Sequence, residues 1–404
     1  MQYIVYAIPA FFILIGVELL IDRLKKTGYY RLNDAVTNIS LGIGSQLAGL
    51  FIKGLTLGVY IYIYKNHRII QDIPQNALTV FLLFIGIDFF YYWFHRLAHE
   101  IGVLWGSHVV HHQSEEYNFS VALRQSWSQG MFSWVFYLPL AFIGFSVELF
   151  VLINALQTLY QFWIHTKLIH KMPAPFEYVF NTPSHHRVHH GQNPLYIDRN
   201  HGGTLIIFDR LFGTFQEELE PVVYGITQPA NSWNPLWLNI EYWIDWYHNF
   251  INADGIINKL KTIYKYPGWK ANQSDIKAFN PAEIKKFDVF VSKKMNTYVL
   301  IHFVIILLLS SVLLNILGSE NMPLLLYQKS IIASFLIYSL FSIGIILENK
   351  KWSLFVELIR LLLFQVVLFY ISQISTQVPF YMTYVFGAVS LFSMLFLILN
   401  RKKE

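Results

Sequence analysis

The chain has 404 residues, of which 54% are hydrophobic and only 14% are charged. An average soluble domain carries about 25% charged residues, so this composition argues against a soluble globular enzyme. The absence of cysteine excludes disulfides, thiolate-bound haem, cysteine-held iron–sulfur clusters and a cysteine nucleophile. The net charge of +5 fits basic cytoplasmic loops of a membrane protein better than nucleic-acid binding, which we do not expect.

Long apolar runs predict an all-α, multi-pass membrane protein with about nine spans, each near the ~20 residues that a helix needs to cross a bilayer. The first run has no basic residue before it and no small-residue cleavage site after it, so we expect a retained span. In chain order, the expected spans are Tyr3–Ile21, Val36–Tyr64, Ala77–Phe94, Gly130–Val147, Glu148–Ile164, Thr297–Ile316, Ser330–Leu347, Trp352–Ile371 and Phe380–Leu399.

The basic residues predict which side of the membrane holds the large hydrophilic segment. Residues 165–296 contain 14 of the 30 Lys and Arg residues. Because Lys and Arg concentrate in cytoplasmic loops, we expect this segment in the cytoplasm and the N-terminus outside. The chain then divides into N-terminal spans at residues 1–76, a catalytic domain at 77–296 and C-terminal spans at 297–404. The Lys-rich stretch Lys259–Lys294 is interpreted as a solvated surface, with anionic-lipid contact as the alternative.

Histidines gather in three short motifs near the cytoplasmic ends of the expected spans. Residues three and four apart on a helix share a face, so each motif is expected to direct two or three imidazoles toward one point. Without a shared cation, many of these ring nitrogens would be buried and unpaired, so we predict metal binding. The motifs are His95-x-x-x-His99, His108-x-x-His111-His112 and His186-x-x-His189-His190.

A ninth donor is expected at the end of the fifth span. Asn154, Gln157 and Gln161 recur at helical spacing and form a polar stripe that ends in His165. Such stripes inside a span face a site or a wet cavity, or they hydrogen-bond to a neighbouring helix. We expect His165 to be a ligand.

Eight clustered ligands exceed what one first-row ion uses, so two metals are implied, held in a histidine-rich cap on the cytoplasmic side. The pair Thr182-Pro183 is typical of a helix start and would place the third motif in the first turns of a short helix. The sequence leaves His170 and His185 undecided as ligands. It favours a non-ligand role for His201.

The residues alone leave zinc, copper and iron open. The Glu-x-x-His pairs of carboxylate-rich di-iron bundles are absent, and the nearest pattern, Asp245-x-x-His248, lies in an expected interfacial amphipathic helix. A divalent-metal transporter would hold its ligands near the bilayer midplane, and a zinc-dependent membrane hydrolase would use fewer histidines per metal. Because the histidines gather at the cytoplasmic ends of the expected spans and in the adjoining loop, the sequence disfavours a transporter. The zinc hydrolase stays open as an alternative to an oxygen-activating enzyme.

Acidic residues within the spans have two interpretations. Asp88 lies two turns before His95 on the same face and is either functional or paired with Arg96 or Arg124. Glu357 and Arg360, one helical turn apart, are expected to form a mutual ion pair.

The order of the three motifs among apolar helices resembles the fatty acid hydroxylase and sterol desaturase superfamily over about residues 77–215. Within this superfamily, the residue sequences of several tracts resemble the alkylglycerol monooxygenases more closely than the other members. These tracts are His95-Arg-Leu-Ala-His99-Glu100, Gln161-Phe-Trp-Ile-His165, Asn181-Thr-Pro-Ser-His-His-Arg-Val-His-His190 and residues 197–215.

This resemblance implies a non-haem centre of two iron ions that activates O2 to attack a C–H bond of a lipid substrate in the bilayer. The clustered histidines then become iron ligands, and Glu100 becomes an acid important for activity. The likeness to alkylglycerol monooxygenases further implies tetrahydrobiopterin as cofactor and the ether-linked carbon of a glyceryl ether as target. A fatty acid hydroxylase or a sterol desaturase with the same metal core is the alternative, and the electron donor is left open.

Overall fold

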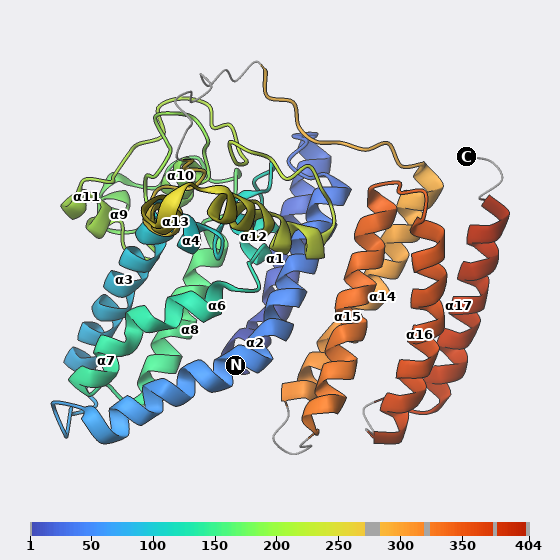
Figure 1. The fold of residues 1–404 in the computed structure, drawn as a ribbon, viewed down its shortest axis with the longest axis horizontal. Helices are drawn as coiled ribbons and strands as arrows, with labels where there is room; N and C mark the ends of the chain where they lie inside the picture. The colour runs from blue at the N-terminus through green and yellow to red at the C-terminus, as the bar shows by residue number, and fades with distance from the viewer. Residues whose placement is uncertain (1, 271–282, 319–323, 375–377, 401–404) are drawn as a thin grey trace. The chain divides into compact units, whose positions relative to one another are not determined.

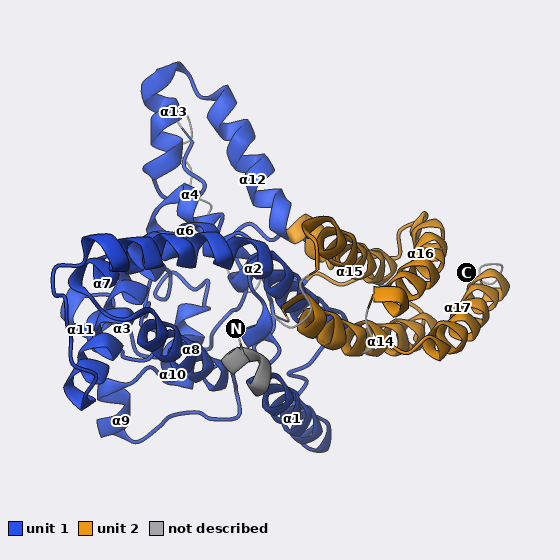
Figure 2. Ribbon diagram, turned by 90° about the horizontal axis from the view of Figure 1, so that it is seen from below, with its two compact units in different colours: residues 1–231, 239–286 blue, residues 232–238, 287–404 orange. Residues whose placement is uncertain are grey.

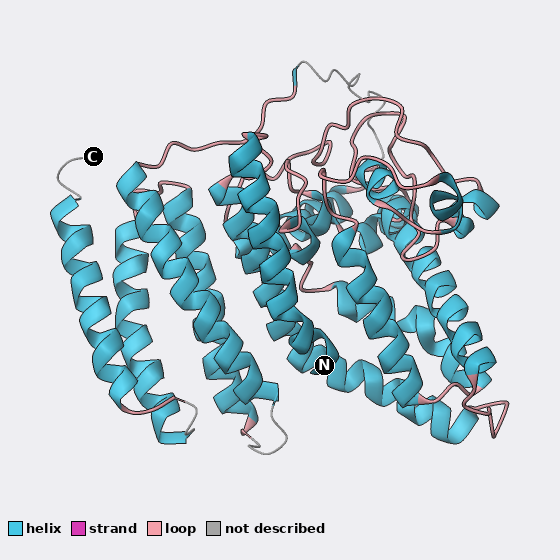
Figure 3. Ribbon diagram, turned by 180° about the vertical axis from the view of Figure 1, so that it is seen from behind, coloured by secondary structure: helices cyan, strands magenta, loops and turns pink. Residues whose placement is uncertain are grey.

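A computed structural model describes residues 2–270, 283–318, 324–374 and 378–400 of the chain. Every regular element in these residues is helical, apart from two isolated β-bridges, which confirms the predicted all-α class (Figure 3). The chain forms two compact units (Figure 2). Unit 1 comprises residues 1–231 and 239–286, and unit 2 comprises residues 232–238 and 287–404. Part of the Lys-rich stretch, residues 271–282, lies outside the described residues.

Unit 1 is built on four long helices, α1 (Gln2–Lys25), α2 (Leu32–His67), α3 (Ala77–Glu100) and α8 (Val147–Trp163). Shorter helices follow α3 and α8 and lie together at one end of them (Figure 1). These are α4 (Gly102–Trp105), α5 (Val109–His112), α9 (Ala174–Val179), α10 (Pro183–His189), α11 (Ile207–Phe212), most of α12 (Pro235–Asn252) and α13 (Gly255–Tyr264). Between α5 and α8 lie the 3₁₀ helices η1 (Val121–Leu123) and η2 (Trp134–Tyr137), with α6 (Gln129–Ser133) and α7 (Leu138–Ile143).

An apolar core fixes the long helices of unit 1 against each other. Tyr60 of α2, Leu83 and Ile87 of α3, and Phe150 of α8 are buried in one cluster. The predicted polar stripe on α8 contributes a helix–helix hydrogen bond, because Gln157 Nε2 donates to the carbonyl of Phe84 at 2.8 Å. The helix ends that carry the histidines are thereby held in register.

Six helices of the described residues are long and apolar enough to cross a membrane: α2, α3 and the four helices of unit 2. The expected count of about nine spans is therefore not confirmed. The single span expected at Gly130–Val147 is instead broken into α6, η2 and α7. It ends at Gly144, whose φ of 118° no ordinary L-residue adopts easily. Helix α8 has 17 residues, which makes it about 26 Å long against a hydrocarbon core of about 30 Å.

Unit 2 packs its helices in chain order: α14 (Lys293–Gly318), α15 (Leu326–Leu347), α16 (Ser353–Ile374) and α17 (Tyr381–Asn400). The predicted ion pair on α16 is confirmed, because Arg360 Nη2 lies 2.5 Å from Glu357 Oε1 and both residues are buried. A buried pair of this kind is stable only when its remaining donors and acceptors are satisfied.

Those remaining groups are satisfied by the neighbouring helices. Tyr298 of α14 and Ser342 of α15 donate to the two oxygens of Glu357, at 2.5 and 2.7 Å. Arg360 also donates to His302 Nδ1 at 2.9 Å, so the ring proton of neutral His302 sits on Nε2, 2.9 Å from the hydroxyl of Ser393 on α17. One polar network thus joins all four helices of unit 2.

We predict that Arg360→Met destabilises unit 2, because it leaves the Glu357 carboxylate buried without its cation. The free energy of unfolding should fall by about 3–5 kcal/mol. Thermal or denaturant unfolding of the purified protein in detergent measures this loss. The double variant Glu357→Gln/Arg360→Met removes both charges and should recover part of the stability, whereas equal losses in the two variants would show that the pair does not couple.

Candidate metal centre

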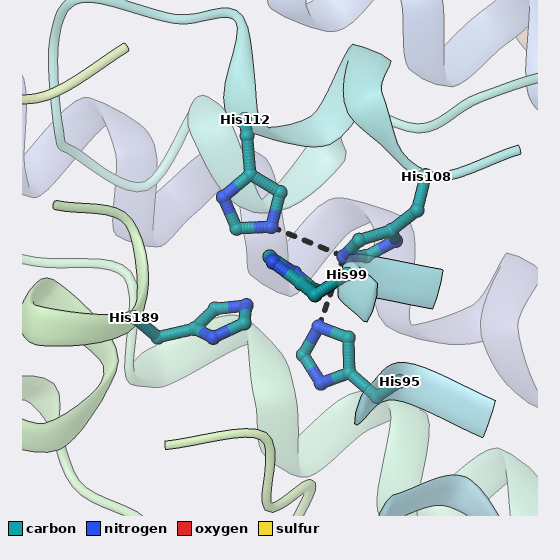
Figure 4. Close-up of side chains that lie close together, drawn as sticks. All are labelled: His95, His99, His108, His112 and His189. Carbon is teal, nitrogen blue, oxygen red and sulfur yellow. Dashed lines mark hydrogen bonds between the residues drawn. The ribbon is translucent and has the colours of Figure 1, made fainter. Parts of the chain in front are cut away.

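Nine buried histidines form two adjoining groups at the end of unit 1 where the short helices gather. Within each group, one ring nitrogen of every residue lies within 4.8 Å of those of the others. The first group contains His95, His99, His108, His112 and His189 (Figure 4), and the second contains His111, His165, His186 and His190. These are the nine histidines that the sequence analysis selected.

The spacing of each HxxHH motif predicts that its histidines face one point. In the structure, each motif instead contributes histidines to both groups. In the short helix α5, His112 faces the first group and His111 faces the second. In α10, His189 faces the first group, while His186 and His190 face the second. Because neighbours in the sequence point to different sides, the two groups are directly adjacent, and the rings of His112 and His190 stack with centroids 4.4 Å apart.

Five of the nine rings have their outward nitrogen held by a hydrogen-bond acceptor. His95 Nδ1 lies 2.8 Å from the carbonyl of His201, and His111 Nδ1 lies 2.7 Å from that of Arg124. A carbonyl only accepts, so these Nδ1 atoms carry the proton and the Nε2 atoms keep a bare lone pair. The same holds for His165 with Gln161 O, His189 with Arg199 O and His108 with Gln129 Oε1. Such hydrogen bonds orient metal-binding imidazoles.

The inward Nε2 atoms face one another. His95 Nε2 lies 2.9 Å from His108 Nε2, and His111 Nε2 lies 3.3 Å from His165 Nε2, although neither atom of either pair has a proton to donate. The Nε2 atoms of His99 and His189 have no hydrogen-bond partner among the described residues. Buried lone pairs that meet in this way are costly unless a cation lies between them, so the residues fit a metal centre.

The protonation of these rings also suits metal binding. Burial lowers the pKa of His108 to about 3 and that of His111 to about 4. Both imidazoles are therefore neutral at pH 7, which is the form that binds a metal.

His165, the ligand candidate outside the motifs, is fixed through its two sequence neighbours. Tyr117 donates to the carbonyl of Ile164 at 3.0 Å. The hydroxyl of Thr166 donates to the buried carboxylate of Glu18, on α1, at 2.5 Å. The first helix of the chain thereby contributes to the placement of the second group.

The two undecided histidines lie in neither group. His170 is exposed. His185 is buried, with Nδ1 3.3 Å from the Thr182 hydroxyl and Nε2 4.0 Å from Glu177. The predicted helix start is confirmed, since α10 begins at Pro183 with Thr182 before it, although the Thr182 side chain makes no capping bond to the helix backbone.

Two acidic residues have partners that the sequence did not reveal. Glu100 accepts from Arg96 at 2.8 Å. The acid beside His99 is instead Asp198, with its Oδ1 3.6 Å from Nδ1. Asp198 follows the last histidine motif along the chain. In the sequence analysis it appears only as part of the tract 197–215 and is not selected as a site residue.

Asp88 is not paired with either arginine, contrary to one interpretation of the sequence. Its two oxygens accept from the backbone N–H groups of Thr204 and Leu205, each at 2.8 Å. Burial of α3 against this loop explains the difference, because the loop supplies two donors directly to the carboxylate. Asp88 therefore anchors the loop that follows the last histidine motif.

Comparison with known proteins gives a consistent family assignment. Residues 80–214 match the fatty acid hydroxylase family. The alkylglycerol monooxygenase of Danio rerio is 37% identical over 369 residues, which are 90% of this chain and 81% of that protein. The alkylglycerol monooxygenases of Xenopus tropicalis and Homo sapiens are each 45% identical, over 66% of this chain and 60% of their own lengths. No solved structure matches. The chain, with its paired histidine groups on apolar helices, therefore belongs to the alkylglycerol monooxygenase family.

Proposed function

We propose that this chain is a membrane oxidoreductase that uses O2 and two iron ions to hydroxylate a C–H bond of a lipid. The observation that carries the proposal is the convergence of nine buried imidazoles, in two adjacent groups, with their lone pairs directed inward. Iron bound in both groups would supply O2 activation and attack on the C–H bond. A transporter is disfavoured because the histidines lie at helix ends and in loops.

The chain's own residues position the donors and keep water away. The first group would hold one ion and the second group the other. All nine histidines are at most 7% exposed, so the centre is dry. Carbonyl acceptors on the outer side of the rings of His95, His111, His165 and His189 would keep these imidazoles in the required tautomer. Asp198 Oδ1 lies 3.6 Å from Nδ1 of His99 and would orient this ring. We propose that Glu100, which follows His99 on α3, is the acid that supports turnover.

We further propose that the substrate is an alkylglycerol, oxidised at its ether-linked carbon, and that tetrahydrobiopterin supplies the electrons. The names of three relatives support the substrate. The choice of tetrahydrobiopterin rests only on the resemblance to that family. Because two of these relatives are covered over only 60% of their length, substrate and cofactor are proposals for this chain.

The catalytic domain is proposed to be residues 77–296, with the centre facing the cytoplasm. The basic residues concentrated at 165–296 support this orientation. A centre at the helix ends would receive a lipid laterally from the bilayer and a reductant from the aqueous side.

Membranes that contain the protein should convert alkylglycerol to an aldehyde in the presence of O2 and tetrahydrobiopterin, and lose this activity without the pterin. Mass spectrometry of the products, with free fatty acid as the competing substrate, measures this. A 2-hydroxylated fatty acid as the only product would instead assign the chain to the fatty acid hydroxylases, and no oxidised lipid with either substrate would contradict the activity.

Purified protein should contain about two iron ions per chain, and His111→Ala and His189→Ala should each lose one of them, from different groups. Losing a donor should cost more affinity than the about 10–100-fold that follows loss of an outer hydrogen-bond partner. Elemental analysis after anaerobic purification measures the metal content, including misloaded zinc. His170→Ala, at an exposed histidine outside both groups, is the matched control. Full metal content in both ligand variants would contradict the assignment.

A further inference from the structure

A tenth histidine stands beside the first group. His201 is fully buried, at 0% exposure. Its ring centroid lies 5.1 Å from that of His99 and 5.7 Å from those of His95 and His189. Centroid distances from 4.3 to 6.5 Å occur within the first group. His201 is therefore a near neighbour of three members of the group, although the sequence favoured a non-ligand role.

The backbone of Asp198 interacts with the imidazole of His201. Neither ring nitrogen, however, makes a hydrogen bond of normal geometry with the described residues. An unsatisfied buried polar group is destabilising, so an apolar side chain would be more stable here. His185, the other buried histidine outside both groups of unit 1, does contact Thr182 and Glu177. The unpaired nitrogens of His201 therefore call for a ligand that the protein itself does not supply.

The backbone around His201 is fixed by two buried carboxylates. Asp209 accepts from the N–H groups of His201 and Gly202, each at 2.7 Å. Asp88 accepts from the backbone N–H groups of Thr204 and Leu205, as described above. Asn200 adopts a φ of 57°, and its side chain bonds to two carbonyls, at 3.0 and 2.8 Å. A loop held in a disfavoured conformation by so many contacts is typical of a functional position.

Gly202 is required in this loop as well. A Cβ atom there would lie 2.4 Å from the carbonyl oxygen of Leu205. His201 also acts through its own carbonyl, which accepts the Nδ1 proton of His95. The same residue thus orients one donor of the first group and presents a second imidazole to it.

We propose that His201 is a tenth nitrogen donor of the centre and completes the first group as a six-coordinate site. The inference rests on the proposed metal occupancy. His201 is outside the set of nitrogens within 4.8 Å of one another. The proposal therefore requires its ring to turn toward the bound ion. The centre is then asymmetric, with six imidazoles around one ion and four around the other. The ion in the second group would then have fewer protein donors and more room for other ligands than the ion in the first.

The test uses His201→Phe, which keeps a planar ring and removes both nitrogens. Metal-free protein should be as stable as the wild type or more stable, because two unsatisfied groups disappear. The gain in thermal stability on metal addition should fall, since a donor is lost. With Co²⁺ as the probe, the visible absorption of the wild type combines a weak six-coordinate site and a stronger four-coordinate site, and it should intensify in the variant. Resistance of one ion to a chelator should fall by about tenfold or more.

His185→Phe is the matched control. It should destabilise the metal-free protein and leave the cobalt spectrum unchanged. A His201→Phe protein with the wild-type cobalt spectrum and chelator resistance would overturn the inference, and His201→Gln gives the same test if the phenylalanine variant does not fold. A wild-type protein that binds no metal would overturn both the inference and the proposed function. Two bound metals without lipid oxidation would overturn the proposed function alone.

Discussion

The structure of unit 1 depends on one electrostatic constraint, the confinement of many imidazole lone pairs in a space without water. Five of the nine rings are tied on their outer side to a carbonyl or amide oxygen, as His111 is to Arg124, and this contact fixes the direction of the inner nitrogen. Burial keeps the imidazoles neutral, because it lowers the pKa of His108 and of His111. The protein alone leaves this arrangement unfavourable, and a cation makes it favourable. Stability of the surrounding helices and affinity for metal are therefore linked, because the same hydrogen bonds serve both.

The buried histidines lie apart from the apolar core that holds the long helices of unit 1 together. The rings come from the last turn of α3, from the segment just after α8 and from short helices between and beyond them. The long helices are held by an apolar core that contains none of the histidines. A rigid apolar base of this kind allows an irregular, polar assembly to be built at its end.

Much of this was predictable from local sequence. The helical class, the nine converging histidines and the Glu357–Arg360 pair follow from spacing that spans at most one or two turns. The division of each HxxHH motif between the two groups could not be predicted from local sequence. In a helix as short as α5, tertiary packing decides which group each histidine faces. The closeness of His201 to the first group did not follow either. The loop that carries it is anchored through Thr204 to Asp88, more than a hundred residues earlier in the chain, which no local pattern connects with it.

Helix α1 ends more than fifty residues before the matched fatty acid hydroxylase region, yet Glu18 within it receives the hydroxyl of Thr166 and the backbone N–H of Phe119. The region recognised by homology thus makes two hydrogen bonds to a buried carboxylate outside it. A shortened chain that began at the family boundary would expose both donors and lose the brace behind His165. Helix α1 is therefore a structural part of the hydroxylase core, although it lies outside the matched region.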